Sequence, residues 1–342
     1  MFDFSKKFSK ARLAEFADIV LNMQRRIDFK VSSRGWCYLM EQSGYIDKSQ
    51  FSKVENAINN CRREGLLPVD FVAEEDARAF SGVEQPNGGA KYVLNWMLRD
   101  VSEGHKYIIP DWWEDEDYYI QVLVEKIDLK TLFEPVCAKY HIPIANAKGW
   151  SSILQRAEYA LRFKEAEERG MKAVLLYCGD HDADGLRISD TIRKNLEQVS
   201  DIVWSEGQKG YDPSNLIIDR FGLNYDFIRE QGYTWIDNLI TGSGKDLASP
   251  KHINHGLAYV QQYLKQFGAR KCEANAIVTT PKVARQLMEE VILKYLGKDA
   301  PDRFKKKKDS AMWEYKDLLN KTGVMTAIQK AQEINNKEED EE

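Results

Sequence analysis

Three aspartates in the segment AVLLYCGDHDADG have the spacing of a metal site. An apolar run, which predicts a buried strand, leads Asp180, Asp182 and Asp184 into a turn bounded by Gly179 and Gly185. Carboxylates this close repel one another, and a hard divalent cation that prefers oxygen ligands compensates for the repulsion. A helix N-terminus explains one such acid but explains three poorly. We therefore expect bound Mg²⁺ here, or Mn²⁺ in its place.

Glu125 is the second acid whose position is informative. It ends the strand-like run YYIQVLVE, 55 positions before Asp180. If both runs are strands of one parallel sheet, their carboxyl ends meet at the edge where such sheets bind ligands. We expect a metal site of Glu125, Asp180 and Asp182, with Asp184 as a further ligand. An EF-hand is excluded, because Thr191 stands where that calcium loop requires Glu.

Strand-like runs alternate with helical patterns from residue 118 onward. The strand-like runs are YYIQVLVE, PIANA and AVLLYCGD, with helices expected at 129–140, at 151–169 and from Asp184. Beyond residue 200, the runs IVW and NLIID alternate with helices expected at 224–231, 252–266 and 281–296. Alternation of this kind with nearly continuous apolar strands predicts an α/β fold, in which helices cover both faces of a parallel sheet.

The N-terminal region predicts a different arrangement. Helical patterns cover 10–27 and 34–42, and Ser49 is the expected cap of a third helix. The run LLPVDFV then predicts a strand, with Pro68 suited to a sheet edge. Three helices followed by a β element are the outline of a winged helix, a DNA-binding fold. A small helical domain that only packs against its neighbour is the alternative.

Composition and charge limit the class of protein. The 342 residues are 43% hydrophobic and 30% charged, which is typical of a folded globular chain. The net charge is −5, yet the first 66 residues hold twelve Lys or Arg against eight Asp or Glu, so a phosphate-binding surface is expected near the N-terminus. No apolar run is long enough to span a membrane, and the first residues lack the apolar run of a signal peptide. We expect a cytoplasmic protein, associated with the nucleoid in a bacterium or archaeon, or else encoded by a phage.

The five cysteines are scattered and form no CxxC pair. Neither a disulfide framework nor a zinc site is therefore expected. The zinc-binding cysteines of a primase are also missing, which makes that activity less suitable than the alternatives below.

The acid pattern resembles a known domain. A Glu at the end of one strand, followed by D-x-D-x-D-G after a later strand, is similar to the Toprim domain of topoisomerases, primases and related nucleases. The D-x-D-A-D-G form is closest to that of gyrase-class enzymes, whereas the topoisomerase VI A-subunit family shows D-x-D-P-x-G. The resemblance implies that Glu125, Asp180 and Asp182 bind the metal ion.

The rest of the chain is more similar to the topoisomerase VI A-subunit family, which includes the enzymes that make meiotic double-strand breaks. Members place a winged helix of the CAP-like type before Toprim and carry a motif resembling R-D-I-Y-Y. Here SSRGWCYL puts Arg34 and Tyr38 at the matching positions, while Gly35, Trp36 and Cys37 replace the residues between them. The segments RFGLNYDFI and KCEANAI are similar to family segments that follow Toprim.

This resemblance implies a mechanism and partners. Tyr38 would attack a phosphodiester of double-stranded DNA and hold the broken end as a phosphotyrosine, with Arg34 stabilising charge on the phosphate. Asp180 and Asp182 would hold Mg²⁺, Glu125 would bind the metal or transfer protons, and Asp184 could complete a second metal position. The family also implies a homodimer and, for strand passage, an ATPase on a separate subunit.

Two other interpretations stay open. In the first, Tyr38 is structural, the acids activate water, and the protein is a metal-dependent DNA nuclease with the same architecture. In the second, the chain binds DNA without catalysis, and its Toprim fold serves as a scaffold. The intact set of acids weighs against the second.

The predicted domains follow from these patterns. They are a winged-helix domain with its N-terminal helix at 1–100, an acidic and aromatic connector at 101–117, a Toprim domain with its extension at 118–300, a helical hairpin at 301–335 that includes a lysine run, and an acidic tail at 336–342.

Overall fold

A computed structural model gives the fold, and it describes residues 6, 8–73, 82, 84–147, 152–204, 207, 210–240 and 245–337. The chain forms two compact units. Unit 1 comprises Met1–Glu74 and Glu116–Tyr295, and unit 2 comprises Glu75–Asp115 and Leu296–Glu342. The acidic tail was predicted at 336–342, but helix α12 extends to Lys337, and residues 338–342 lie outside the described residues. Among the described helices, none combines the length and the apolar character needed to cross a membrane.

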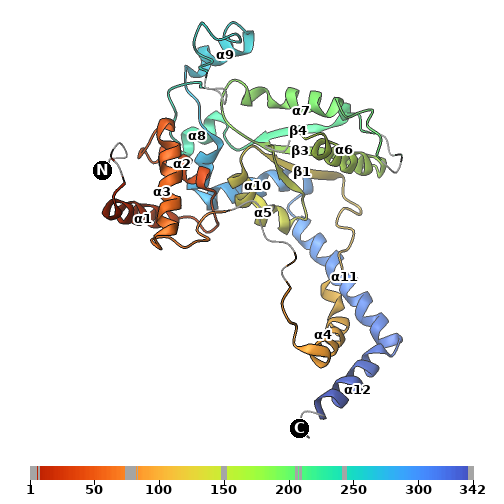
Figure 1. Cartoon of the computed structure of the whole chain (residues 1–342). Coiled ribbons are helices and arrows are strands. Elements are labelled where there is room, and N and C mark those ends of the chain that lie inside the picture. The colour runs from red at the N-terminus through yellow and green to blue at the C-terminus, as the bar shows by residue number, and fades with distance from the viewer. Residues whose placement is uncertain are drawn as a thin grey trace. The chain divides into compact units, whose positions relative to one another are not determined.

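A four-stranded parallel sheet forms the centre of unit 1 (Figure 1). Its strands are β1 (Tyr118–Val124), β2 (Ile144–Asn146), β3 (Lys172–Cys178) and β4 (Ile217–Phe221), in the order β2-β1-β3-β4. The last residue of β1, Val124, pairs with Cys178 at the end of β3, and Cys178 pairs with Phe221 of β4. The expected α/β fold with a parallel sheet is therefore confirmed.

Helices cover both faces of this sheet (Figure 1). They are α5 (Ile127–Lys139) and α10 (Pro281–Leu296) on one face, and α6 (Ile153–Glu168) and α7 (Ile188–Glu197) on the other. Arg285 of α10 donates to the Leu132 carbonyl of α5 at 3.1 Å. On the opposite face, the Tyr159 hydroxyl of α6 donates to the Val122 carbonyl of β1 at 2.6 Å. These contacts fix the helices to the sheet and to each other.

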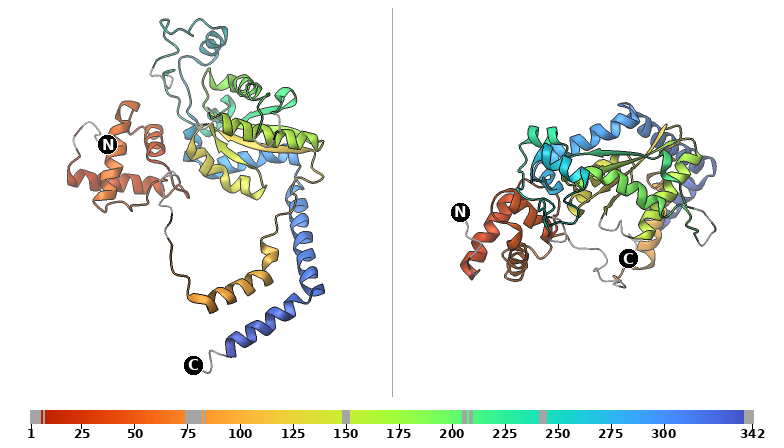
Figure 2. Two further views of the ribbon diagram at one scale, coloured as in Figure 1. Left: turned by 45° about the vertical axis from the view of Figure 1, so that its right-hand side comes forward. Right: turned by 90° about the horizontal axis from the view of Figure 1, so that it is seen from above.

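The N-terminal part of unit 1 is helical, and Figure 2 shows its helices as one group. It contains α1 (Lys10–Gln24), α2 (Ser33–Gln42), the short 3-10 helix η1 (Lys48–Gln50) and α3 (Phe51–Arg63). The three predicted helices are present, but the cap before the third differs from the prediction. The N-cap residue of α3 is Gln50, which makes no side-chain cap hydrogen bond. Asp47 caps the preceding η1, because its carboxylate accepts from the Ser49 amide at 2.8 Å and Gln50 closes a capping box.

The predicted strand LLPVDFV is wrong. The described residues there form turns, with one isolated bridge between Ser32 and Ala73. Three apolar side chains of this run, Leu67, Phe71 and Val72, are buried in the helical core instead of pairing in a sheet, whereas Val69 is exposed. Phe71 stacks on Trp36 with ring centroids 5.3 Å apart. The run is apolar because it is buried, so its composition could not distinguish a strand from a turn.

Further short elements complete unit 1. They are η5 (Gly185–Arg187), η6 (Pro213–Asn215), α8 (Tyr225–Gln231), α9 (Ala258–Phe267) and η7 (Ala274–Thr279). The helix expected at 252–266 begins six residues late, at Ala258. The preceding residues form turns in which the amide of Asn254 donates to His252 Nδ1 at 3.1 Å.

Unit 2 consists of α4 (Gly89–Ser102), η3 (Gly104–Lys106), α11 (Ala300–Lys321) and α12 (Val324–Lys337). The sequence indicated the α11 and α12 hairpin but not α4, which packs against α12. Lys307, in the lysine run of α11, donates to the Trp112 carbonyl at 2.9 Å, and Lys308 donates to that of Ile108. Part of the lysine run therefore serves packing within this unit.

Candidate functional site

The carboxyl ends of β1 and β3 bring two of the predicted acids together. Glu125 directly follows β1, and Asp180 follows β3 after Gly179. The Glu125 amide donates to the Cys178 carbonyl at 2.9 Å, and the Asp180 amide donates to Glu125 Oε2 at 2.8 Å. In the order β2-β1-β3-β4, the connections leave β1 and β3 in opposite directions, so the two acids lie at a topological switch point. Parallel sheets bind ligands at such points.

Lys126 lies between these two carboxylates. Its ammonium is 2.6 Å from Glu125 Oε1 and 3.0 Å from Asp180 Oδ2. The side chains of Lys126, Glu125 and Asp180 are 22%, 28% and 12% exposed, so solvent screens these ion pairs only in part. Burial alone would lower the pKa of Lys126, but the carboxylates of Asp180 and Glu125 outweigh it and raise that pKa well above its usual value. The two acids therefore already share one cation.

The backbone around Asp180 is tightly held. Asp180 Oδ1 accepts from the Ala274 amide at 2.7 Å, and the Arg220 guanidinium of β4 donates to the Asp180 carbonyl at 2.9 Å. Burial raises the pKa of Asp180 to about 8, although Lys126 opposes the shift. Burial acts in the same direction on Glu125, but there Lys126 and the Asp180 amide outweigh it and lower the pKa. Lys126 therefore favours the ionised form of both acids, and its effect exceeds that of burial at Glu125.

The other two predicted ligands are not drawn into this pair. Asp182 Oδ1 accepts from the Gly185 amide at 2.6 Å, and Asp184 is exposed and accepts from the Tyr259 hydroxyl at 2.8 Å. A Cβ on Gly185 would lie 2.2 Å from the Asp180 carbonyl oxygen, so this turn requires glycine. Within the described part of the chain, no three His, Cys, Asp or Glu side chains gather closely enough to hold a metal ion.

A second charged cluster lies beside the first. Glu273 is paired with Lys271 at 3.0 Å and with Lys48, and the Lys271 and Glu273 side chains are 5% and 4% exposed. Burial alone would raise the pKa of Glu273, but the three lysines Lys126, Lys271 and Lys48 lower it to about 2. A backbone bridge between His181 and Cys272 brings this segment to the acids. The KCEANAI segment is therefore part of the site.

Tyr38 and Arg34 lie on α2, within reach of the same charges. The Tyr38 ring packs edge-on against Phe51 with centroids 5.0 Å apart, and the Arg34 guanidinium lies 5.9 Å from the Tyr38 ring centre. Burial raises the pKa of the Tyr38 hydroxyl and Glu273 adds to this, whereas Lys126 and Arg34 lower it. Lys48, which is paired with Glu273, lies 6.0 Å from the Tyr38 ring centre, so Tyr38 is near the second charged cluster.

The structure explains the glycine that follows Arg34. A Cβ on Gly35 would lie 2.2 Å from Asp128 Oδ2 and 2.5 Å from a Val31 methyl carbon. Asp128 is buried at the start of α5, and its Oδ1 accepts from the Ser32 amide at 2.9 Å. The Ser32 hydroxyl caps α2 by accepting from the Gly35 amide at 3.0 Å. The Asp128 carboxylate of α5 holds Ser32 in place, and only glycine at position 35 leaves room for it.

Several residues of this site were missed by sequence reasoning. Lys126, Lys48, Arg220 and Asp128 hold the acids or α2 in place, and only Lys126 gave a local signal, since it directly follows Glu125. The contacts of the others join segments that are distant in sequence. Cys37, at the position of the first family tyrosine, is buried with its pKa raised to about 12, so its thiol stays protonated at neutral pH.

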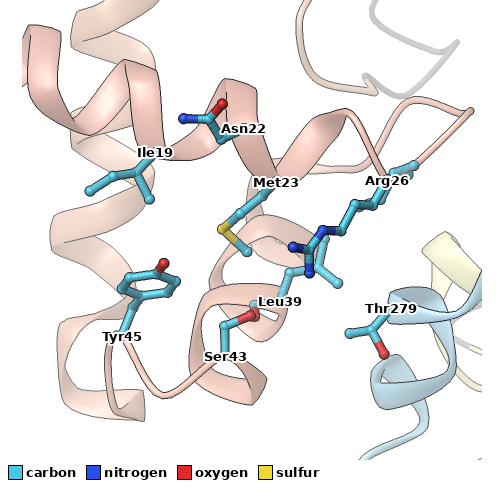
Figure 3. A pocket seen from close by; sticks show the side chains of 9 residues that line it. Ile19, Asn22, Met23, Arg26, Leu39, Ser43, Tyr45 and Thr279 are labelled. Atoms are coloured by element: carbon cyan, nitrogen blue, oxygen red, sulfur yellow. The ribbon is translucent and has the colours of Figure 1, made fainter. Parts of the chain in front are cut away.

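A cavity of about 320 Å³ lies elsewhere in unit 1 (Figure 3). Figure 3 shows the Met23, Ser43 and Tyr45 side chains facing it from the helical part, with Thr279 from η7 on the other side. None of the carboxylates described above lines this cavity. It is therefore not part of the acid site.

The chain matches no protein-family model, and no curated protein or solved structure matches it.

Proposed function

We propose that this protein cleaves DNA strands with a divalent metal ion, as a winged-helix plus Toprim enzyme of the topoisomerase VI A-like type. The main support for this proposal is that Glu125 and Asp180 meet at the switch point of the sheet and share one cation, the Lys126 ammonium. Tyr38 supports the proposal because charges of the same site act on its hydroxyl. Acids, lysines and a tyrosine gathered in this way suit chemistry on a phosphodiester.

The donor set fits a hard divalent cation. Mg²⁺ is commonly bound through one or two carboxylates, with waters and substrate phosphates completing its shell. Glu125 and Asp180 would be the direct ligands, with Asp182 and Asp184 as further ligands in the proposal. A bound Mg²⁺ or Mn²⁺ would neutralise charge that develops on the phosphate oxygens.

Tyr38, Glu125 and Arg34 would each have a separate role in strand cleavage. The Tyr38 hydroxyl oxygen would form the new bond to phosphorus while the bond to the leaving sugar oxygen breaks. Glu125 would take up the tyrosine proton and return it to the leaving sugar oxygen. The Arg34 guanidinium beside the Tyr38 ring would stabilise the negative charge on the phosphate. The bond energy is then kept in a phosphotyrosine, and rejoining is possible.

A metal-dependent nuclease with the same architecture is the second candidate. One observation favours it: burial raises the pKa of Tyr38, which makes its hydroxyl harder to ionise. In that case the acids activate water, Tyr38 only packs against Phe51, and the DNA ends are free.

Partners follow from the same proposal. Double-stranded DNA is the substrate, and the helical part of unit 1 would bind it as a winged-helix domain. A homodimer and a separate ATPase subunit are carried over from the family resemblance. In that family the tyrosine of one protomer meets the metal site of the other, which is why the resemblance implies a homodimer.

The test is incubation of the purified protein with labelled supercoiled DNA and Mg²⁺ or Mn²⁺, followed by a denaturing gel with and without protease. The wild type is compared with Tyr38→Phe, Asp180→Ala and, as a matched control, Tyr45→Phe. For a tyrosine transesterase, we expect labelled DNA to stay attached to the wild-type protein and to Tyr45→Phe. This attachment should be lost in Tyr38→Phe and in Asp180→Ala. Free nicked DNA that survives Tyr38→Phe but not Asp180→Ala identifies the nuclease. Intact DNA with wild-type protein under both metals contradicts the proposal.

A further inference from the structure

The carboxylate oxygens that face a metal ion at this site are limited in number. Glu125 Oε2 accepts from the Asp180 amide at 2.8 Å, and Asp180 Oδ1 accepts from the Ala274 amide at 2.7 Å. The remaining oxygens of the two acids are Glu125 Oε1 and Asp180 Oδ2. Both contact the ammonium of Lys126, at 2.6 and 3.0 Å. A divalent cation therefore needs the same two atoms that Lys126 occupies.

Lys126 also has a clear function without metal. Two carboxylates joined through an amide hydrogen bond repel each other, and the repulsion is strong where solvent is partly excluded. The ammonium lies between them and neutralises one charge. Because Lys126 follows Glu125 directly, its backbone is fixed beside the end of β1, which keeps the ammonium within reach of both acids.

We propose that Lys126 is a built-in counter-ion of the acid pair, which a divalent cation displaces when it binds. Metal binding then breaks the two ion pairs of Lys126. The affinity of the site for the divalent cation is therefore lower than the carboxylates alone would give. The inference rests on the metal site of the proposed function, but it does not depend on cleavage by Tyr38.

Two positive charges repel each other at the acids, so a bound divalent ion drives the Lys126 ammonium away from them. Glu273, which is paired with Lys271 and Lys48, is the other carboxylate whose charge acts on Lys126, and Lys126 in turn acts on the Tyr38 hydroxyl. Lys126 thereby couples occupancy of the metal site to the electrostatic environment of Tyr38.

The first test is Mn²⁺ binding without DNA, measured by isothermal titration calorimetry. Lys126→Met keeps the length of the side chain and removes its charge, and Lys130→Met, one turn further along α5, is the matched control. We expect Lys126→Met to bind Mn²⁺ about 10-fold more tightly, equivalent to about 1.4 kcal/mol, and Lys126→Arg to stay near the wild type. Affinity in Lys126→Met that equals or falls below that of the wild type overturns the inference.

A second test uses the wild type, in case Lys126→Met does not fold. The protein is acetylated with an N-hydroxysuccinimide ester, with and without Mn²⁺, and each lysine is quantified by peptide mass spectrometry. Displacement from the acids should raise the labelling of Lys126 several-fold, with Lys130 unchanged. Equal or lower labelling of Lys126 with Mn²⁺ contradicts the inference.

These outcomes separate the inference from the proposed function. Tighter Mn²⁺ binding by Lys126→Met with no DNA cleavage by the wild type supports the counter-ion and rejects the cleavage chemistry. Failure of both the wild type and Lys126→Met to bind millimolar Mn²⁺ rejects the metal site and the counter-ion together.

Discussion

Glu41 of α2 is an acid whose ionisation opposes folding. Its Oε2 atom is buried and, among the described residues, has no hydrogen-bond partner. Burial raises the pKa of Glu41 to about 7, and nearby Glu273 adds to the shift while Lys48 opposes it. The native state therefore holds the Glu41 proton more tightly than the unfolded chain, whose glutamate pKa is about 4.5.

The first prediction is the pH dependence that follows from Glu41. Protonated Glu41 contributes fully to the free energy of unfolding below pH 4.5. This contribution is lost as pH rises toward 7, because the unfolded chain loses the proton at lower pH than the native state does. Glu41→Gln should flatten stability across this range and stabilise the protein at pH 8 by about 1–2 kcal/mol, after allowance for solvent screening. Urea unfolding at pH 5 and pH 8 measures both. Equal pH dependence in wild type and variant would falsify the assignment.

Glu273 should make stability depend on pH in the opposite direction from Glu41. Its pKa is lowered to about 2, so its stabilising contribution is present above the unfolded value of 4.5 and lost as pH falls toward 2. Glu273→Gln leaves Lys271 buried without its partner, and we predict a loss of about 3–5 kcal/mol in unfolding free energy. Asp226→Asn, which breaks an exposed pair with Arg229, is the control and should cost less than about 1 kcal/mol. Similar losses in both variants would contradict the prediction.

At the scale of elements, the N-terminus of α2 depends on a contact between Gly35 and Asp128. Gly35→Ala places a methyl group against the carboxylate and the Val31 side chain, and we predict a loss of about 1–3 kcal/mol in stability. Asp128→Ala removes the acceptor of the Ser32 amide and should cost about 1–2 kcal/mol. The double variant should lose less than the sum, because the methyl group no longer meets a carboxylate.

Chemical denaturation of this set of variants measures the coupling. Gly256→Ala is the control, since its added Cβ meets no atom within 4 Å, and it should change stability little. Strict additivity of the Gly35 and Asp128 losses would show that the two residues do not interact in solution.

The elements differ in how far sequence could predict them. β1 and β3 were predictable because a strand buried on both faces carries its signal in its own apolar residues. The positions of Glu125 and Asp180 were predictable as well, because these acids follow the ends of the two strands. LLPVDFV gave the same signal yet forms turns, because burial against Trp36 requires apolar residues in any conformation. Helix α4 carries large apolar residues such as Tyr92, Trp96 and Met97, yet none of its residues is buried, so its apolar character did not identify it as part of a core.

The contacts that sequence could not reveal are those between distant segments. Asp128 meets Ser32 across 96 positions, and Lys48 meets Glu273 across 225. Neither pair has a spacing that any local pattern records. The local rule of strand ends predicted that Glu125 and Asp180 would meet, but the orientation of Asp184 toward Tyr259 depends on α9, which folds back from far along the chain.

At the scale of the whole molecule, the two compact units have separate sources of stability. Unit 1 has the sheet and its buried strands, whereas the described helices of unit 2 bury few residues, among them Phe304 and Leu319. Polar contacts therefore carry more of the stability of unit 2. The Tyr315 hydroxyl donates to the Val101 carbonyl at 2.7 Å, and Lys307 and Lys308 donate to carbonyls of the segment before β1.

We predict that removing these lysine contacts loosens unit 2 alone. In Lys307→Ala/Lys308→Ala, the carbonyls of Trp112 and Ile108 lose charged donors, each worth about 1.5–3 kcal/mol, so amide exchange in 104–114 and in α11 should quicken at least 10-fold. Lys305→Ala, which breaks a surface pair with Asp309, is the control and should exchange like the wild type. Hydrogen-exchange mass spectrometry follows both units at once, and protection of β1 and β3 should not change. Loss of protection in those strands would mean that the stability of the sheet depends on unit 2 and that the two units unfold as one.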